Sequence, residues 1–221
     1  MQFLEDTYLF NSQTQIKSIG SDEKGQFLTF DDTIFYPQGG GQPFDLGTIS
    51  TKSTMVVTGV FFDPALGQIK HYVSSMPQSL KVGETVRMSI DAQRRLMNAR
   101  NHTSGHLLTF AVESNSPCKG VKGYHFNEGC YVEFDSVVPL QAAQIEQIVN
   151  QYISQSLPIT QRFVHSGNLI GGKPSRIMEV ASLGVMGCGG THVSNTREIG
   201  SFKIRKMKTT KGKTKISYSI G

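Results

Sequence analysis

Two histidines, His102 and His106, stand four residues apart in Asn101-His102-Thr103-Ser104-Gly105-His106-Leu107-Leu108. On a helix, residues with that spacing lie one above the other on one face, so both imidazoles can bind one divalent ion. Downstream, Gly187-Cys188-Gly189-Gly190-Thr191-His192 carries a thiol and an imidazole at the same spacing in a glycine-rich turn. Taken alone, the histidine pair favours ordinary, partly buried histidines. The addition of Cys188 and His192 reverses that interpretation, because a Cys-His-His-His set suits Zn²⁺.

Composition describes an ordinary globular chain of 221 residues, 38% apolar and 18% charged, long enough for one large domain or two small ones. No apolar run approaches the length of a membrane span. The first six residues carry acids where a signal peptide would carry bases. We therefore expect a cytoplasmic protein with no membrane partner. Of three cysteines, an odd number that argues against a disulfide framework, we expect Cys118 and Cys130 to be inert.

Positive charge is concentrated at the end of the chain. Residues 201–221 contain no acid and seven bases, which exceed the whole net charge of +5. Such a cluster favours a polyanion, most often nucleic acid, although a hairpin edge protected by solvated lysines has the same composition. The predicted nucleic-acid contacts are Lys203, Arg205, Lys206, Lys208, Lys211, Lys213 and Lys215.

The elements that must position these groups begin with a β-rich region over residues 1–90. Short apolar stretches at 26–30, 55–62 and 85–90, separated by turn signals, predict a small barrel or sandwich. At Asp91, a plausible N-cap, the pattern changes to a helix that runs to about Glu113. Its apolar stripe consists of Leu96, Ala99, Thr103, Leu107 and Phe110. Gly105 leaves room beside His106 for a ligand or a strand.

One loop within the β-rich region, Tyr36-Pro37-Gln38-Gly39-Gly40-Gly41-Gln42-Pro43, does not read as a strand. Its glycines permit unusual backbone dihedrals and a close approach to a ligand, and its glutamines add amide donors and acceptors. It lacks the spacing and the lysine-serine ending of a phosphate-binding P-loop. Taken alone, the loop favours a structural bend.

Beyond the first helix, segments 122–126 and 130–135 read as two strands, followed by a helix over about 139–155. Residues 159–165 are expected to be extended, with His165 on the surface or hydrogen-bonded. A strand over 176–180 is expected to lead into the Cys188 turn. The chain ends in a predicted hairpin whose connection is 209–213.

The two ligand motifs resemble those of the editing domain of alanyl-tRNA synthetase and, more closely, of the free-standing editing proteins called AlaX. The loop at 36–42 resembles the glycine-rich motif of the longer AlaX form, and Glu198-Ile199-Gly200-Ser201-Phe202-Lys203-Ile204 also matches. The resemblance covers nearly the whole chain. It implies an α+β fold, with a small β-barrel-like domain over 1–90 that carries the glycine-rich loop. A two-layer α/β editing domain of the threonyl/alanyl-tRNA synthetase type would follow over 91–221.

That resemblance also implies a trans-editing hydrolase, a deacylase that cleaves the ester of mischarged Ser-tRNA(Ala); removal of glycine is left open. The implied zinc ligands are His102, His106, Cys188 and His192, which with Thr103 form the predicted catalytic set. We expect a substrate pocket formed by Gln38, Gly39, Gly40, Gly41, Gln42, Lys122, Gly123 and His125. No obligate protein partner is expected. The metal either orients the substrate or activates water, and the Thr103 hydroxyl alternatively bonds its own helix backbone.

Three alternatives remain open. A related zinc-bearing editing site occurs in threonyl-tRNA synthetases, so another mischarged tRNA is a possible substrate. A nonenzymatic, zinc-stabilised RNA-binding module also fits four ligands and a basic edge. The glycine-rich loop argues against that module, because plain binding has no need of a tight pocket near the metal. The third alternative is a metal-free domain whose histidines match by coincidence.

Overall fold

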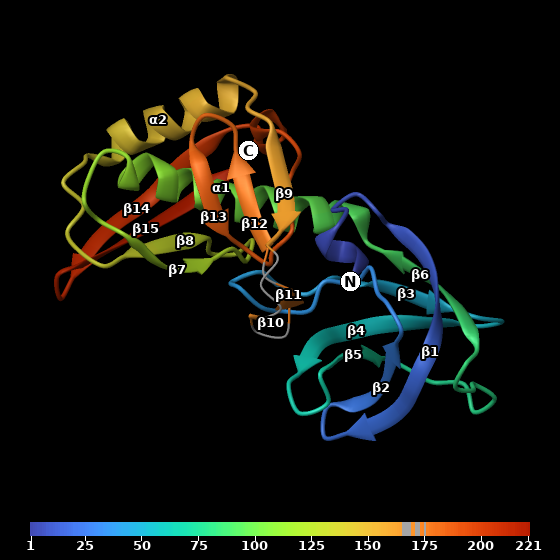
Figure 1. Cartoon of the computed structure of the whole chain (residues 1–221). Coiled ribbons are helices and arrows are strands. Elements are labelled where there is room, and N and C mark those ends of the chain that lie inside the picture. Colours follow the sequence, from blue (N-terminus) through green and yellow to red (C-terminus); the bar gives the residue numbers. More distant parts are fainter. Residues whose placement is uncertain (165–168, 171–172, 175) are drawn as a thin grey trace. The chain divides into compact units, whose positions relative to one another are not determined.

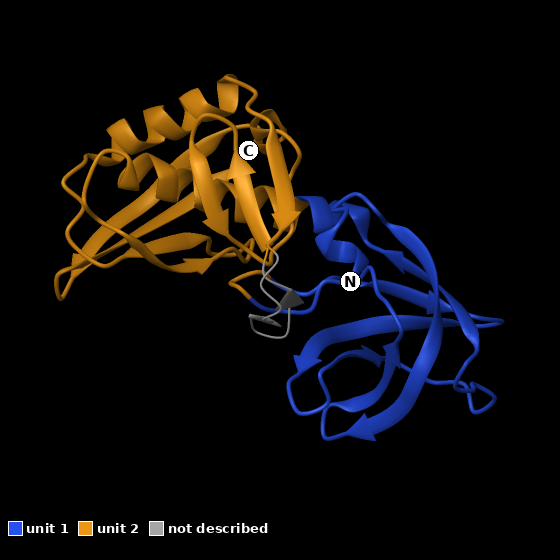
Figure 2. Cartoon of the chain, viewed as in Figure 1, with its two compact units in different colours: residues 1–39, 43–96, 169–173 blue, residues 40–42, 97–168, 174–221 orange. Residues whose placement is uncertain are grey.

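The computed structural model describes residues 1–164, 169–170, 173–174 and 176–221 (Figure 1). The chain divides into two compact units (Figure 2): unit 1 comprises residues 1–39, 43–96 and 169–173, and unit 2 comprises 40–42, 97–168 and 174–221. The domain boundary after residue 90 stays a prediction. Gly40–Gln42, three residues of the glycine-rich loop, group with unit 2. His165 lies outside the described residues.

Unit 1 is a closed antiparallel barrel of six strands in the order β1-β2-β5-β4-β3-β6 (Figure 1). A short 3-10 helix, Gln2–Leu4, precedes it. The strands are β1 Asn11–Asp22, β2 Gly25–Phe30, β3 Gly47–Ser50, β4 Thr54–Asp63, β5 Gln68–Val73 and β6 Thr85–Ile90. The three predicted strands correspond to β2, β4 and β6, so the α+β class with an N-terminal barrel is confirmed. Closure leaves the sheet without free edges.

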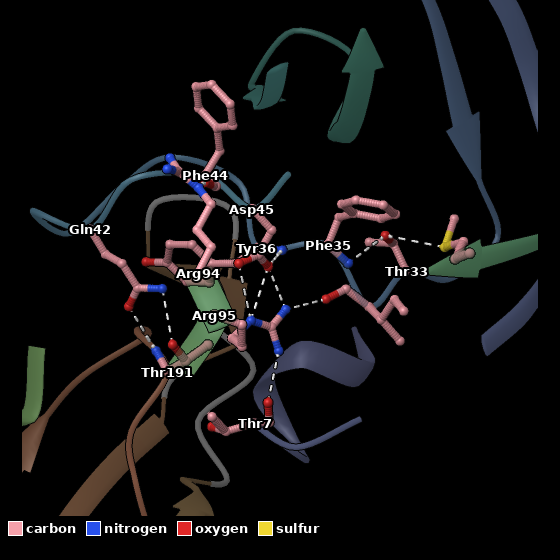
Figure 3. Close-up of polar contacts among 12 residues, drawn as sticks. Thr7, Thr33, Phe35, Tyr36, Gln42, Phe44, Asp45, Arg94, Arg95 and Thr191 are labelled. Carbon is pink, nitrogen blue, oxygen red and sulfur yellow. Dashed lines mark hydrogen bonds and ion pairs between the residues drawn. The ribbon is translucent and has the colours of Figure 1, made fainter. Parts of the chain in front are cut away.

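A buried ion pair fastens unit 1. Arg95 and Asp45 are both fully buried, and Arg95 Nε donates to the two Asp45 carboxylate oxygens at 3.1 and 3.0 Å. Arg95 Nη1 donates to the Thr7 carbonyl at 3.1 Å, and the Tyr36 amide donates to Asp45 at 2.7 Å (Figure 3). Each charge therefore finds several partners inside the barrel unit, as a buried pair requires.

Helix α1, Ala92–Glu113, begins and ends as predicted. The Asp91 carboxylate accepts a hydrogen bond from the Arg94 amide at 3.0 Å, which confirms the N-cap. The predicted stripe is inward-facing, since Ala99, Thr103, Leu107 and Phe110 are buried and Leu96 is partly buried. Burial extends beyond the stripe, because residues 101–105, 107–108 and 110–112 are all buried. Unit 2 encloses this part of the helix on several sides, so polar residues such as Asn101 and Ser104 are buried as well.

Unit 2 contains a four-stranded antiparallel sheet in the order β14-β15-β8-β7. Its strands are β7 Gly120–Tyr124, β8 Tyr131–Phe134, β14 Phe202–Thr210 and β15 Lys213–Ile220. Alternate side chains, among them Val132, Phe134 and Ile216, enter a core shared with α1 and with α2, Ala142–Ser154. The turn of the terminal hairpin is Lys211-Gly212, shorter than the predicted connection, because pairing continues to Thr210 and Lys213.

A second sheet of unit 2 joins β9 Ile159–Phe163, β12 Arg176–Val180 and β13 Gly184–Gly187 in the order β13-β12-β9. β10 Leu169–Ile170 pairs with β11 Lys173–Pro174, and a 3-10 helix spans Thr196–Ile199. The predicted strand over residues 176–180 is confirmed as β12, but it does not lead into the Cys188 turn as expected. The chain reverses after Val180 and forms β13 first, and Cys188 follows that strand.

Two further expectations concern the cysteines and the membrane. Cys118 and Cys130 are buried, and each thiol donates to a backbone carbonyl, that of Val137 and Phe126 respectively. Burial raises the pKa of Cys130 to about 11, which keeps its thiol protonated. Neither helix in the described part of the chain is both long and apolar enough to cross a bilayer.

Candidate metal centre

Helix α1 and the loop after β13 bring the four predicted ligands together within unit 2. The His102 and His106 rings stack nearly parallel, 5.1 Å apart between centroids. The Cys188 Sγ lies 3.3 Å from Nε2 of His102, 3.3 Å from Nε2 of His106 and 3.2 Å from Nε2 of His192. One ligand atom from each residue lies within 4.8 Å of all the others. The cluster can therefore hold a metal ion.

The donor set fits Zn²⁺ in chemistry and in size. Zn–S bonds of about 2.3 Å and Zn–N bonds of about 2.0–2.1 Å at tetrahedral angles separate sulfur from nitrogen by about 3.5 Å. The observed separations of 3.2–3.3 Å are close to that value. The Gly190 amide also donates to the Cys188 Sγ at 3.3 Å, which favours the thiolate form that binds metal.

The ligand loop is held by Arg176, a buried residue of β12. Its Nε donates to the Cys188 carbonyl at 3.1 Å and its Nη2 donates to the Gly190 carbonyl. Gly190 has to be glycine, because a Cβ there would lie 2.0 Å from Cε1 of His102. The tight loop and the guanidinium together place Cys188 against the two helix histidines.

Gln42 fixes the tautomer of His102. The Thr191 amide, which can only donate, lies 3.0 Å from Gln42 Oε1, so that atom is the oxygen and not the amide nitrogen. His102 Nδ1 lies 2.8 Å from the same oxygen and must donate to it. The Gln42 amide nitrogen donates to the Thr191 hydroxyl at 2.9 Å (Figure 3). His102 Nε2 is therefore left as a lone pair directed at the ligand cluster, as a metal ligand requires.

His192 and His106 are oriented by the same logic. The Thr103 hydroxyl donates to the Ala99 carbonyl at 2.8 Å, so it can only accept from Nδ1 of His192 at 3.3 Å. His106 Nδ1 lies 3.2 Å from the Met186 sulfur, a weak acceptor. All three histidines thus carry their hydrogen on Nδ1 and direct Nε2 toward Cys188.

Burial keeps the imidazoles of His106 and His192 neutral. It lowers the pKa of His106 to about 4, with a smaller contribution from the nearby Arg176 charge. Burial likewise lowers the pKa of His192 well below its usual value, with smaller contributions from His106, Arg176 and His125. Neutral imidazole is the form that binds a metal.

A fourth histidine, His125, lies beside the cluster without belonging to it. Its ring stacks on His102 at 4.5 Å between centroids. The Tyr218 hydroxyl donates to the Asn101 carbonyl at 2.8 Å and so accepts from His125 Nδ1, also at 2.8 Å. His125 Nε2 is then an acceptor, and no protein group among the described residues hydrogen-bonds it. Burial, with a smaller effect of His106, lowers the pKa of His125 to about 3.

Glycines make the space for His125. A Cβ on Gly105 would lie 2.3 Å from its Cε1, and one on Gly123 would lie 2.5 Å from its Nε2. The room left by Gly105 is filled by the His125 ring, with the hydroxyl of Tyr218 from strand β15 beside it. Gly41, at φ +77°, accepts from the His125 amide at 2.8 Å, and a Cβ there would lie 2.3 Å from the Gly123 carbonyl.

The remaining predicted pocket residues lie in different places. Gly40, at φ +58°, is next to Gly41, while Gln38 and Gly39 belong to unit 1, where the Gln38 amide donates to the Val60 carbonyl. Lys122 is exposed on β7. Thr103 makes the bond to its own helix backbone that was the alternative to a catalytic role. The predicted tRNA-binding residues all lie on β14, β15 and their connecting turn.

Sequence reasoning missed the residues that support the ligands. Arg176, Met186 and Tyr218 carry no motif of their own, and Gln42 was predicted only as a pocket residue. Gln42 precedes His102 by 60 residues, and Thr191 follows Gln42 by 149. Contacts between residues so far apart in the chain leave no local pattern in the sequence.

Two protein families match parts of this chain. The family described as tRNA synthetases class II (A) matches residues 5–94. The family described as the threonyl and alanyl tRNA synthetase second additional domain matches residues 175–216, which include Cys188 and His192.

The chain also resembles alanine–tRNA ligases. It is 31% identical over 199 residues to that of Thermotoga petrophila, an alignment covering 80% of this chain and 22% of that protein. It is 29% identical over 229 residues to that of Methanothermobacter thermautotrophicus, covering 94% and 25%. It is 28% identical over 214 residues to that of Methanobrevibacter smithii, covering 88% and 24%. The chain spans about a quarter of the length of these relatives and is homologous to that part of them.

Proposed function

We propose that this protein is a zinc-dependent aminoacyl-tRNA deacylase, which hydrolyses the ester of alanine tRNA charged with serine. The observation that carries the proposal is the convergence of His102, His106, Cys188 and His192 beside His125, whose ring stacks on His102. The similarity to alanine–tRNA ligases, including the second additional domain, supports a tRNA substrate. An editing protein of the AlaX type is the finer assignment that we propose.

Zn²⁺ is the metal we propose, held by the three Nε2 atoms and the Cys188 thiolate. When bound it supplies positive charge that polarises the substrate beside it. Four protein ligands complete a tetrahedral set, an arrangement usual in structural sites, so we favour substrate orientation over formation of a metal hydroxide. Thr103 and Gln42 then act by positioning His192 and His102.

His125 is the residue that we propose reads the amino acid. Its Nε2 lone pair is fixed by the Tyr218–Asn101 hydrogen bonds and can accept a hydrogen bond from the serine hydroxyl. An alanine site rejects an added hydroxyl by only about 10²-fold, which is why a second, hydroxyl-reading site is useful. A buried acceptor in the second site favours serine over alanine, because bound alanine would leave that acceptor without a hydrogen-bond donor.

Two other functions are kept as competitors. A nonenzymatic, zinc-stabilised RNA-binding module is favoured by the complete four-ligand set, since structural zinc sites leave no open position. Editing of a different mischarged tRNA is favoured by the match to a domain described for both threonyl and alanyl enzymes. A cytoplasmic location remains a prediction.

The test is deacylation of Ser-tRNA(Ala), Gly-tRNA(Ala) and Ala-tRNA(Ala) side by side, with and without a chelator. We expect rapid loss of serine, sparing of alanine, and restoration of chelator-treated protein by added Zn²⁺. His125→Asn and His125→Leu separate the hydroxyl-reading role: the first retains a polar side chain, and the second should lose the preference for serine over alanine. Binding of all three tRNAs without hydrolysis would refute the deacylase and support the binding module.

A further inference from the structure

The sheet β14-β15-β8-β7 has a second face that does not enter the core. Val132, Phe134 and Ile216 point inward, while their neighbours Tyr131, Glu133 and Lys215 alternate with them on the opposite face. Cross-strand partners share a face. The pairs Lys215 with Glu133, Ser217 with Tyr131, Lys206 with Ser217 and Lys208 with Lys215 therefore assemble one continuous outer surface.

That surface is strongly basic. It holds a pocket of about 630 Å³ lined by Glu133, Thr210, Ser217 and the five lysines 206, 208, 211, 213 and 215. Glu133 pairs with Lys213 at 3.9 Å, but one carboxylate among five lysines leaves the surface positively charged. Clustered, exposed ammonium groups of this kind attract a polyanion.

The same surface carries aromatic rings, which are not needed to bind a polyanion through charge alone. Tyr124 stacks on Phe126 at 4.4 Å between centroids and 16° between planes, and on Tyr131 at 5.3 Å and 13°. Lys215 Nζ lies 3.4 Å from the centroid of Tyr131. The three rings are only half-buried. A row of parallel rings thus ends at a lysine of the basic pocket.

We propose that this outer face binds the unpaired 3′ end of an RNA. Bases stack at the ends of the Phe126–Tyr124–Tyr131 row, and phosphates contact Lys206, Lys208 and Lys215. Aromatic faces serve single strands, whose bases are free to stack, whereas a duplex offers this surface mainly phosphates. When a base joins Tyr131, the flexible Lys215 ammonium moves from the ring to a phosphate.

The row also leads toward the metal centre. Tyr124 directly precedes His125, whose ring stacks on His102. Because successive residues of an extended chain face opposite sides, Tyr124 lies on the outer face and the buried His125 on the inner one, so an RNA end on the aromatic row has to pass the end of β7 to reach the ligand cluster. This step rests on the proposed function, since it assigns the esterified end of the tRNA to that position.

The competing interpretation is that the rings only shield the sheet and the lysines are solvated. Fluorescence anisotropy on the full chain separates the two, using a labelled single-stranded RNA of about 12 nucleotides ending in CCA and a blunt-ended duplex of the same sequence. The variants are Tyr131→Leu and Phe126→Leu, which keep an apolar side chain without the aromatic face. Tyr8→Leu is the matched control, because Tyr8 is a 37% exposed tyrosine of unit 1.

We expect Tyr131→Leu and Phe126→Leu each to weaken single-strand binding about tenfold, to leave duplex binding unchanged, and to exceed the effect of Tyr8→Leu. Lys215→Gln should lower the slope of log affinity against log salt by about 0.7, whereas Lys52→Gln, an exposed lysine of unit 1, should not. Equal losses of single-strand binding in all three aromatic variants would overturn the proposal. So would a duplex that binds as tightly as the single strand and is weakened equally by the variants.

The two proposals fail separately. Binding of uncharged RNA needs no hydrolysis, so a chain that binds the strand through Tyr131 but deacylates no tRNA refutes only the proposed function. A chain that deacylates Ser-tRNA(Ala) with an unchanged KM in Tyr131→Leu refutes only the aromatic platform.

Discussion

Both units bury histidine, and the way the ring nitrogens are used distinguishes a structural site in unit 1 from a candidate metal centre in unit 2. His71 of unit 1 donates from Nδ1 to the Leu28 carbonyl at 3.2 Å and accepts at Nε2 from the Thr33 hydroxyl at 2.8 Å. The unit 2 histidines 102, 106 and 192 also have partners at Nδ1, but all three direct Nε2 at Cys188.

The buried ion pair of unit 1 also differs from the ligand cluster of unit 2. Arg95 and Asp45 neutralise each other, and their surrounding hydrogen bonds come from the barrel unit itself. In unit 2, three imidazole nitrogens and the Cys188 sulfur converge on one another. Buried acceptors that converge in this way need a positive ion, since polar groups removed from water must be compensated. Removing a residue should therefore have different consequences in the two units.

The largest effect is expected in unit 2 from Cys188→Ala. The variant should lose the metal and lower deacylation more than about 100-fold, because even residues that only support metal ligands cost 10- to 100-fold. Metal content by mass spectrometry and initial rates give the measurement. Cys118→Ala is the matched control, since its thiol is buried away from the cluster. Full activity in Cys188→Ala would remove the case for a metal centre.

The next effect is expected in unit 1 from Arg95→Met, which leaves the Asp45 carboxylate buried and uncompensated. Such a loss costs about 3–5 kcal/mol of stability. Hydrogen exchange of the β1–β6 amides measures it, with the exposed Arg87→Met as control. Adding Asp45→Asn should recover part of the loss while metal content stays constant throughout. Loss of metal in Arg95→Met would contradict the assignment of separate roles to the ion pair and the ligand cluster.

A pH effect on unit 1 should follow from His71. Burial lowers its folded-state pKa to about 4, below the ordinary value of 6.5. The unfolded chain therefore binds a proton first, and stability should fall as pH drops from about 6.5 to about 4, by up to about 3 kcal/mol. Hydrogen exchange of the barrel amides across this range measures the loss. In His71→Phe the slope should be shallower, and an unchanged slope would exclude His71 as its source.

The smallest effect is expected at Gln42, which supports the metal ligand His102. Gln42→Ala removes the acceptor that holds His102 and should weaken metal affinity 10- to 100-fold. Gln42→Glu keeps an oxygen acceptor and should recover most of that affinity. Competition with a chromogenic chelator measures both, with the exposed Gln38→Ala as control. Equal losses in the Ala and Glu variants would show that Gln42 acts through packing and not through His102.

Short-range patterns in the sequence determined much of this protein. The Asp91 cap and the end of α1 followed from helix signals, and β2, β4 and β6 followed from short apolar runs. The α+β class with an N-terminal barrel, which the family resemblance implied, was predicted correctly. The two ligand pairs were readable because each places its two residues four apart, a separation that one helix turn or one tight loop converts into proximity.

Only the tertiary structure decided how those pairs are completed. The tautomer of His102 depends on Gln42 and Thr191, and the space beside Gly105 is taken by His125. The single apolar stripe expected on α1 became burial on several sides, because unit 2 encloses the helix. The reason is physical: local pattern encodes contacts between residues a few positions apart, whereas a hydrogen bond across 60 or 149 residues exists only once the chain has folded.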